Sequence, residues 1–411
     1  MILTLTKIQK FLNDCGTNIK GRLRNQGILF LYSILKHYQM MQNLNSRREW
    51  LKKSGLTVLS GLAASSSTLA FSDKIRISAD DMIHLDKNEN PFGVSPMAKK
   101  ALQESISEGH RYLLSGTREK LIQKLAEREN LNTSNFLTTA GSVEVLGLTS
   151  VFVSRNQGSV ICPYPTFATL PNSCQKMGME LINVPVSGNK TIDLEAMKAK
   201  IKDDTRLVYL CNPNNPTGTI LEAKVLRDFV TEVSQKTMVM VDEAYFEFLN
   251  QSISDMIKSN KNVLVSRTFS KVYGFAGLRV GYLIGHADTI KEMSKYQVSS
   301  TLGISNMVIN AAIAALDDKE FLSMYLKKNR EAADFTHKVL NEMGVAAVAT
   351  QANFMMFPID TYKGKFATDM ANKKILLRDD FKELNGNKWG RVSIGTMDEM
   401  EIFVKAMKQL W

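Results

Sequence analysis

A lysine, two hydroxyl side chains and an arginine lie within one short stretch of this 411-residue chain. Lys271 follows residues 263–266, an apolar β-branched run that predicts a buried strand with the lysine just beyond its end. A lysine held in a dry cleft has a lowered pKa, and its neutral amine can form a Schiff base with an aldehyde. Thr268, Ser270 and Arg279 are close enough in sequence to hold a phosphate dianion together. A lysine nucleophile beside a phosphate site suggests pyridoxal phosphate as the cofactor.

An ordinary explanation also exists, because Lys271 and Arg279 alone would fit solvated loop residues. Other predicted strands, however, also end in polar or aromatic residues. These are Asn215 after strand 207–211, Asp242 and Tyr245 after strand 237–241, and Phe167 after strand 160–162. Each alone could be a turn former, a helix N-cap or a core residue. Their order in one chain favours a shared site.

A glycine turn offers a second phosphate contact. Gly141 precedes Ser142 and Val143, which open a predicted helix that runs to Val153. The first turn of a helix presents free N–H groups and a positive dipole, which suit a phosphate. A simple helix N-cap is the alternative for this turn.

Strands and helices alternate through the middle of the chain, which predicts an α/β fold with a largely parallel sheet covered by helices on both faces. The predicted strands are 160–163, 179–186, 207–211, 237–241 and 263–266, and the predicted helices include 96–107, 117–129, 223–234 and the helix that ends at Val153. Ligands of such sheets bind beyond the carboxyl ends of the strands.

The C-terminal third predicts a smaller α+β domain. Its expected helices are 304–316 and 320–343, and its expected strands are 345–348, 353–357, 375–378 and 391–395. We therefore expect a leader over 1–71, an N-terminal arm over 72–109, a large domain over 110–310 and a small domain over 311–411.

The net charge of +11 is concentrated at the N-terminus. Residues 1–70 contain ten Lys or Arg and two Asp or Glu, which leaves a net charge of only +3 for the remaining 341 residues. A basic leader explains this better than a nucleic-acid-binding surface does. The apolar share of 44% and the charged share of 23% are typical of a soluble globular protein.

The leader resembles a twin-arginine export signal. Residues 46–53 contain Arg47-Arg48, and residues 55–71 are mildly apolar, too short and too polar for a stable membrane anchor. This predicts periplasmic export, with a natural start near Met40 or Met41. The alternative is an amphipathic surface helix on a cytoplasmic protein.

The four cysteines, Cys15, Cys162, Cys174 and Cys211, have neither metal-like nor paired spacing. An odd number remains once the leader is removed, so we expect small buried hydrophobes rather than a disulfide framework. No metal site is predicted.

The strand-end motifs together identify a family resemblance. They are Asn-Pro-x-x-Pro-Thr-Gly at 212–218, Asp-Glu-Ala-Tyr at 242–245, Ser-Lys at 270–271 and Gly-Leu-Arg-x-Gly at 277–281. Over residues 80–411 the chain resembles fold-type I pyridoxal-phosphate aminotransferases of class I/II, and it is most similar to the histidinol-phosphate aminotransferase branch. The resemblance implies a mostly parallel seven-stranded sheet and ping-pong transfer of an amino group between an amino acid, or histidinol phosphate, and a 2-oxo acid.

The resemblance also implies residue roles. Lys271 would carry the cofactor as an aldimine and later act as the base, while Asp242 would keep the pyridine nitrogen protonated. The remaining cofactor contacts would be Asn215 and Tyr245 at the phenolic oxygen, Phe167 on the ring, and Ser142, Val143, Thr268, Ser270 and Arg279 at the phosphate. Tyr112 matches a tyrosine that reaches the phosphate of a neighbouring subunit, which implies a homodimer.

Three residues would bind substrate. Arg391 matches the arginine that holds the substrate carboxylate, Arg378 matches a second arginine for substrate anions, and Asn353 would line the cleft. A solvated strand-end charge is the alternative for Arg378.

The chain departs from the branch at two places that concern the substrate. Arg111-Tyr112 is followed by Leu113-Leu114 rather than Pro-Asp, and Phe167 stands in place of a stacking tyrosine. Decarboxylase, racemase or C-S lyase chemistry on the same cofactor is the alternative activity. A non-enzymatic regulator that binds the cofactor would need a DNA-binding helix-turn-helix, whereas residues 1–71 read as a leader.

Overall fold

The structure, a computed structural model, describes residues 82–299, 303–382 and 386–411. The predicted leader over 1–71 and the start of the predicted arm, residues 72–81, lie outside the described residues. Among the described residues, none of the helices combines the length and the apolar character that a bilayer crossing requires. The domain boundaries expected from the sequence remain predictions.

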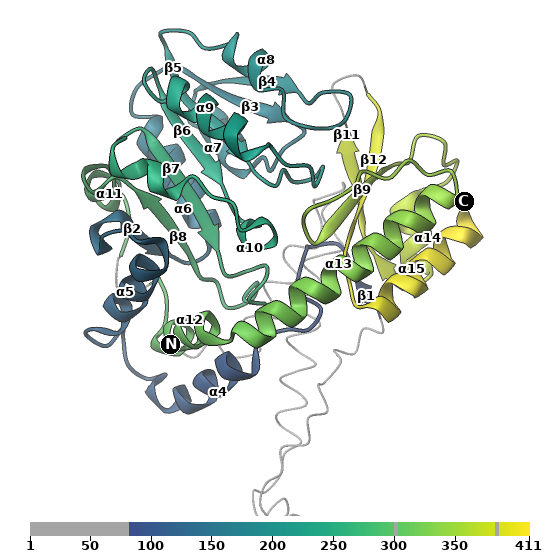
Figure 1. Cartoon of the computed structure of the whole chain (residues 1–411), viewed down its shortest axis with the longest axis horizontal. Helices are drawn as coiled ribbons and strands as arrows, with labels where there is room; N and C mark the ends of the chain where they lie inside the picture. The colour runs from purple at the N-terminus through teal and green to yellow at the C-terminus, as the bar shows by residue number, and fades with distance from the viewer. Residues whose placement is uncertain (1–81, 300–302, 383–385) are drawn as a thin grey trace, which may run out of the picture. The chain divides into compact units, whose positions relative to one another are not determined.

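A seven-stranded sheet, in the order β2-β8-β7-β6-β5-β3-β4, forms the centre of the larger part of the chain (Figure 1). Its strands are β2 Phe136–Thr139, β3 Ser159–Tyr164, β4 Glu180–Pro185, β5 Thr205–Cys211, β6 Met238–Asp242, β7 Val263–Thr268 and β8 Gly281–Gly285. Strand β8 is antiparallel to its neighbours β2 and β7, and the other pairs are parallel. The predicted α/β fold with a mostly parallel seven-stranded sheet is therefore confirmed.

Both faces of this sheet are covered by helices, as expected for buried parallel strands. The α-helices of this part of the chain are α4 Pro96–Glu104, α5 Thr117–Glu129, α6 Ser142–Val153, α7 Thr169–Lys176, α8 Leu194–Lys198, α9 Ala223–Val233, α10 Phe246–Leu249, α11 Ala287–Ser294 and α12 Asn306–Asp317. Helices α5, α9 and α12 contribute side chains to one apolar layer, and α6, α7 and α11 contribute to the other. Cys162, Cys174 and Cys211 are buried free thiols, as predicted.

Strand alternation assigns each residue of the central strands to one of these two layers. In β6, Val239 and Val241 pack in the layer with α5 and α9, while Met240 packs in the layer with α6. In β7, Val265 packs in the layer with α5 and α9, and Leu264 packs in the layer with α6. The two strands thus present alternate residues to opposite faces right up to their carboxyl ends.

The C-terminal third forms a smaller α+β unit. A three-stranded antiparallel sheet, β11-β12-β9, and a two-stranded parallel sheet, β1-β10, pack with three helices around a separate apolar core. The elements are β1 Ile83–His84, α13 Lys319–Glu342, β9 Phe354–Pro358, α14 Phe366–Asn372, β10 Ile375–Leu376, β11 Arg378–Lys382, β12 Lys388–Ser393 and α15 Met397–Leu410. Since β1 precedes α4 in sequence, the start of the described chain completes this C-terminal unit (Figure 1).

One predicted strand, 345–348, is wrong. Val345 is buried, which explains the apolar signal, but the Ala347 N–H turns back to donate to the Val345 carbonyl (2.7 Å). Val348 then donates a single hydrogen bond to Met356 (2.8 Å), and the segment is not assigned to a sheet. The predicted strand 375–378 is divided between β10 and β11.

Candidate active site

A cavity of about 620 Å³ lies at the carboxyl ends of β5, β6 and β7. Most of the residues predicted from the sequence line it, namely Ser142, Val143, Phe167, Asn215, Asp242, Tyr245, Thr268, Ser270, Lys271, Arg279, Arg378 and Arg391. The structure thus brings together side chains from strand ends, from the start of α6 and from the C-terminal unit. In the described part of the chain, no three His, Cys, Asp or Glu side chains gather as metal ligands would.

One end of the cavity is suited to a dianion. The Thr268 hydroxyl donates to Ser270 Oγ (2.9 Å), and Arg279 Nη1 donates to the same oxygen (3.4 Å) and to the Ala276 carbonyl (2.9 Å). Ser142, the first residue of α6, adds the positive end of a helix. Two hydroxyls, a guanidinium and free N–H groups can together neutralise and orient a phosphate.

Gly141 makes this arrangement possible. Its φ of +82° lies in the left-handed region, and a Cβ at this position would meet Arg279 Nη2 at 2.2 Å. A glycine therefore lets the backbone before α6 approach the arginine closely, so the helix N-terminus and the guanidinium face the same space.

Lys271 projects into the middle of the cavity from the loop after β7. Its ammonium donates to the carbonyls of Lys87 (3.2 Å) and Asn88 (3.3 Å). Burial, together with the positive charge of Arg391, lowers the pKa of Lys271 to about 8. A substantial fraction of this amine is therefore neutral near physiological pH, as a nucleophile or a general base requires.

The lowered pKa predicts selective reactivity of Lys271. In the cofactor-free protein, its acetylation by acetic anhydride should rise with pH and reach half its maximal rate near pH 8. Exposed Lys224, whose partner Asp228 raises its pKa, should react slowly at that pH and serves as the internal control. Peptide mass spectrometry across a pH series measures both rates, and equal midpoints for the two lysines would contradict the prediction.

Asp242 lies buried at the tip of β6 with one carboxylate oxygen available. Tyr209 donates to Asp242 Oδ2 (3.1 Å), whereas Oδ1 is buried without a hydrogen-bond partner. Burial raises the pKa of this carboxyl group to about 6. An unpartnered buried carboxylate oxygen is costly, and a cationic N–H donor is the group that best satisfies it.

Tyr245 is held as a hydrogen-bond donor. Its hydroxyl oxygen accepts from Asn88 Nδ2 (2.9 Å) and from Asn215 Nδ2 (3.3 Å). Burial raises the pKa of Tyr245, so the hydroxyl keeps its proton and can donate it to a ligand oxygen.

Arg391 forms the wall contributed by β12. It is 3% exposed, and it donates from Nη1 to Asn215 Oδ1 (2.7 Å) and from Nη2 to the Asp86 carbonyl (2.6 Å). Its Nε is buried without a partner. Burial lowers the pKa of Arg391 to about 10, so the guanidinium stays charged at neutral pH and can bind a carboxylate. Arg378 lines the same cavity but is more exposed and pairs with Asp380.

Two predicted site residues do not line the cavity. Asn353 is fully buried, and its Nδ2 donates to the carbonyl of Asn88 (3.1 Å), which belongs to a residue that lines the cavity; its expected role in substrate binding stays a prediction. The same Nδ2 also donates to the Glu89 carbonyl (3.4 Å), so Asn353 supports the backbone of the arm. Tyr112 is 83% exposed and lies apart from the cavity of its own chain.

The sequence reasoning missed Asn88, Asp86 and Tyr209. Asn88 and Asp86 belong to a turn-rich arm without periodicity, and Asn88 meets Tyr245 across 157 residues of sequence, so spacing offered no signal. Tyr209, in contrast, could have been found from the sequence. A tyrosine inside the apolar strand β5 must find a partner for its hydroxyl when it is buried.

Comparison with known proteins shows a consistent similarity. The family described as Aminotransferase class I and II matches residues 80–407. The histidinol-phosphate aminotransferase of Symbiobacterium thermophilum is 32% identical over 335 residues, which cover 80% of this chain and 90% of the relative. Histidinol-phosphate aminotransferase 1 of Dechloromonas aromatica is 34% identical over 344 residues, with 81% and 91% covered. The solved structure of histidinol-phosphate aminotransferase from Sinorhizobium meliloti, in complex with pyridoxal-5′-phosphate, has a TM-score of 0.72 at 24% identity, with 85% and 98% covered.

Proposed function

Because this chain belongs to the class I and II aminotransferase family, we propose that it transfers an amino group between an amino acid and a 2-oxo acid with pyridoxal phosphate as cofactor. The observation that carries this proposal is the position of Lys271. Its amine, with a lowered pKa, projects into one cavity together with the free oxygen of Asp242 and the dianion site at Ser270 and Arg279.

The described residues fit this cofactor. The unpartnered Asp242 Oδ1 suits a protonated ring nitrogen, and the close approach at Gly141 forms a cradle for the phosphate beside Arg279. When bound, pyridoxal phosphate supplies an electron sink that stabilises negative charge at the substrate α-carbon. Tyr245 would donate to the phenolic oxygen, and the half-buried ring of Phe167 lines the cavity where a flat ring would stack.

Lys271 and Arg391 would perform the steps on the substrate. Arg391 would bind and orient the α-carboxylate of the substrate. Its Nε has no partner among the described residues, whereas its Nη1 and Nη2 already donate to Asn215 and to the Asp86 carbonyl. The neutral amine of Lys271 would then act as the base that takes the proton from the substrate α-carbon. A second substrate, the 2-oxo acid, would be converted by the same steps in reverse.

A spectroscopic titration tests this function. Single amino acids, and histidinol phosphate separately, are added to the purified protein loaded with pyridoxal phosphate, and the visible absorption band is followed. Loss of the band with an amino donor, and its return on adding a 2-oxo acid, is the expected result. A band that never converts would contradict transamination and favour decarboxylase, racemase or lyase chemistry.

The same titration identifies the donor. The named relatives are histidinol-phosphate aminotransferases, but Phe167 offers no hydroxyl and Leu113-Leu114 replaces a Pro-Asp pair. We therefore propose free amino acids as the principal donors, with histidinol phosphate as the alternative. Faster conversion by histidinol phosphate than by any free amino acid would decide for the alternative.

Arg391→Lys is expected to raise the KM for the amino acid by about 100-fold with a smaller change in kcat, because an ammonium cannot form the bidentate contact with a carboxylate. Arg378→Lys should raise KM by about tenfold or less, since Arg378 is partly exposed and already paired with Asp380. Steady-state kinetics with one donor measure both variants, and equal effects would remove the distinction between the two arginines.

The working unit is proposed to be a homodimer. Tyr112 is 83% exposed and Ile106 is 72% exposed, so both side chains are available for contact with another chain. A second copy of the chain would cover them and would bring Tyr112 to the phosphate end of the partner's site. Light scattering should give twice the chain mass. Tyr112→Phe should weaken cofactor affinity without changing that mass, and a monomeric active protein would contradict the proposal.

We also propose that residues 46–71 direct export of the folded protein to the periplasm. Support comes from the Arg47-Arg48 pair and the apolar stretch after it. Cell fractionation of the wild type and of a variant with both arginines changed to lysine tests this. Wild-type protein confined to the cytoplasmic fraction would contradict export.

A further inference from the structure

A buried arginine lies on the face of the sheet opposite to the active-site cavity. Arg267 precedes Thr268 in β7 and Glu243 follows Asp242 at the tip of β6, so strand alternation directs Arg267 and Glu243 away from the cavity. Both are at most 2% exposed. The Glu243 N–H donates to the Ser266 carbonyl (2.9 Å), which continues the pairing of β6 with β7 to this point.

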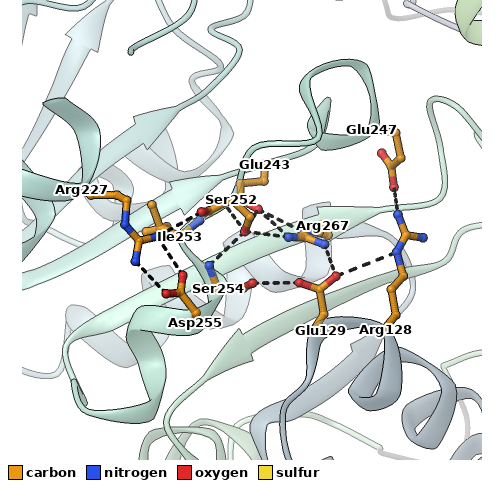
Figure 2. Close-up of polar contacts among 10 residues, drawn as sticks. All are labelled: Arg128, Glu129, Arg227, Glu243, Glu247, Ser252, Ile253, Ser254, Asp255 and Arg267. Carbon is orange, nitrogen blue, oxygen red and sulfur yellow. Dashed lines mark hydrogen bonds and ion pairs between the residues drawn. The ribbon is translucent and has the colours of Figure 1, made fainter. Parts of the chain in front are cut away.

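Arg267 uses its whole guanidinium in this position. Its Nε donates to Glu243 Oε2 (3.0 Å), Nη1 donates to Glu129 Oε1 (2.6 Å), and Nη2 donates to Ser252 Oγ (2.7 Å) (Figure 2). The guanidinium also lies over the Phe246 ring, 3.6 Å from the centroid. We call Arg267, Glu243, Glu129 and Ser252 the Arg267 cluster.

The carboxylates of the cluster are satisfied as well. Glu243 Oε1 accepts from the Ile253 N–H (3.0 Å) and from the Ser252 hydroxyl (3.0 Å), and Glu129 Oε2 accepts from Ser254 (2.8 Å) (Figure 2). Replacing a buried ion pair by apolar groups of similar volume is often neutral for stability, so stability alone does not account for this cluster. A fully satisfied polar network does hold its members in one geometry.

The same end of helix α5 reaches the chain after Lys271. Arg128, beside Glu129, donates from Nη1 to the Tyr273 hydroxyl (2.5 Å). The Tyr273 ring packs on Phe269 with centroids 4.8 Å apart. The residues on both sides of Lys271 are therefore anchored to one helix end from behind the cavity.

We propose that Arg267 is a positioning residue for the cofactor, an inference that rests on the proposed function. Through Glu243 it fixes the spacing between the tip of β6, which carries Asp242, and the tip of β7, which carries Thr268, and through Glu129 it ties the tip of β7 to helix α5. These two tips would bind different ends of one rigid molecule, the ring nitrogen and the phosphate. A change in their spacing would therefore weaken both contacts at once.

Cofactor affinity in matched variants tests the proposal. Arg267→Lys keeps the charge but cannot bridge Glu243, Glu129 and Ser252 together, and Glu243→Gln removes one of the two carboxylates. Ser252→Ala is the mildest change. Arg227→Met is the control, because it removes an exposed ion pair with Asp255 and one hydrogen bond to the Ser252 backbone carbonyl (3.3 Å) but leaves the Arg267 side-chain contacts intact (Figure 2).

The dissociation constant for pyridoxal phosphate is measured by equilibrium dialysis, at a temperature where circular dichroism shows each cofactor-free variant folded. The pH titration of the visible absorption is measured on the loaded protein. We expect the dissociation constant to rise at least about tenfold in Arg267→Lys and Glu243→Gln, with a shifted titration midpoint, and to rise less in Ser252→Ala. Arg227→Met should match the wild type in both measurements.

A folded Arg267→Lys protein with the wild-type dissociation constant and titration midpoint, altered only in melting temperature, would overturn the proposal. If that variant does not fold, Glu243→Gln and Ser252→Ala decide by the same two measurements. Wild-type protein without affinity for pyridoxal phosphate would instead overturn the proposed function, so the two failures are distinguishable.

Discussion

Lys271→Arg is expected to lower the rate of transamination by at least about 10³-fold. A guanidinium stays protonated at every pH at which the protein is folded, so it can neither attack an aldehyde nor remove a proton from the α-carbon. Lys271, with its pKa lowered to about 8, can do both. Steady-state turnover with the best donor measures the loss.

Two controls separate chemistry from folding in this experiment. Lys224→Ala removes an exposed lysine of α9 and should keep wild-type turnover. Lys271→Arg should also lose most of its bound cofactor on dialysis, because it cannot form the covalent bond to it. The melting temperature of this variant without cofactor should stay close to that of the wild type. Turnover within tenfold of the wild type would exclude Lys271 from the chemistry.

Asp242→Asn is expected to lower kcat by about 10²-fold or more. The amide cannot supply the negative charge that keeps a ring nitrogen protonated, and charge-assisted hydrogen bonds in buried sites are worth about 1.5–3 kcal/mol. The pH dependence of cofactor affinity is a more specific test of the role of Asp242 than kcat. Burial raises the pKa of Asp242 to about 6, so the carboxylate is charged above pH 6 and neutral below it.

Wild-type affinity for pyridoxal phosphate should therefore fall as the pH drops through about 6, and Asp242→Asn should lack this fall because it has no titrating group there. Dialysis at a series of pH values gives both curves. Asp228→Asn, at an exposed position of α9, is the matched control and should follow the wild type. If the affinity of Asp242→Asn for pyridoxal phosphate still falls below pH 6, the pH dependence belongs to another group.

Much of this site could be predicted from the sequence because its residues follow strands. The run 263–266 predicted β7 and the run 237–241 predicted β6, and parallel strands bring their carboxyl ends to the same edge. Asp242, Lys271 and Asn215 were placed together on that basis. Local pattern and global topology agree at these positions, so short-range reasoning was sufficient.

Other parts of the site depend on contacts that no local pattern contains. Asn88 holds Tyr245 because β1 pairs with β10 and brings the arm across the cavity, a contact decided by the packing of the C-terminal unit. The expected strand 345–348 failed for a related reason. Its apolar residues reflected burial of Val345 in the core rather than pairing with another strand.

The arm that closes the cavity also determines when during synthesis the site can exist. The Asn88 N–H donates to Ser393 Oγ (2.7 Å) across 305 residues, and Arg391 reaches back to the Asp86 carbonyl. Such distant contacts form late and slowly. A chain still emerging from the ribosome therefore has β6 and β7 but not the complete cavity, so stable capture of the cofactor must await release of the last residues. Nascent chains that lack residues 391–411 should consequently be degraded without ever binding the cofactor stably.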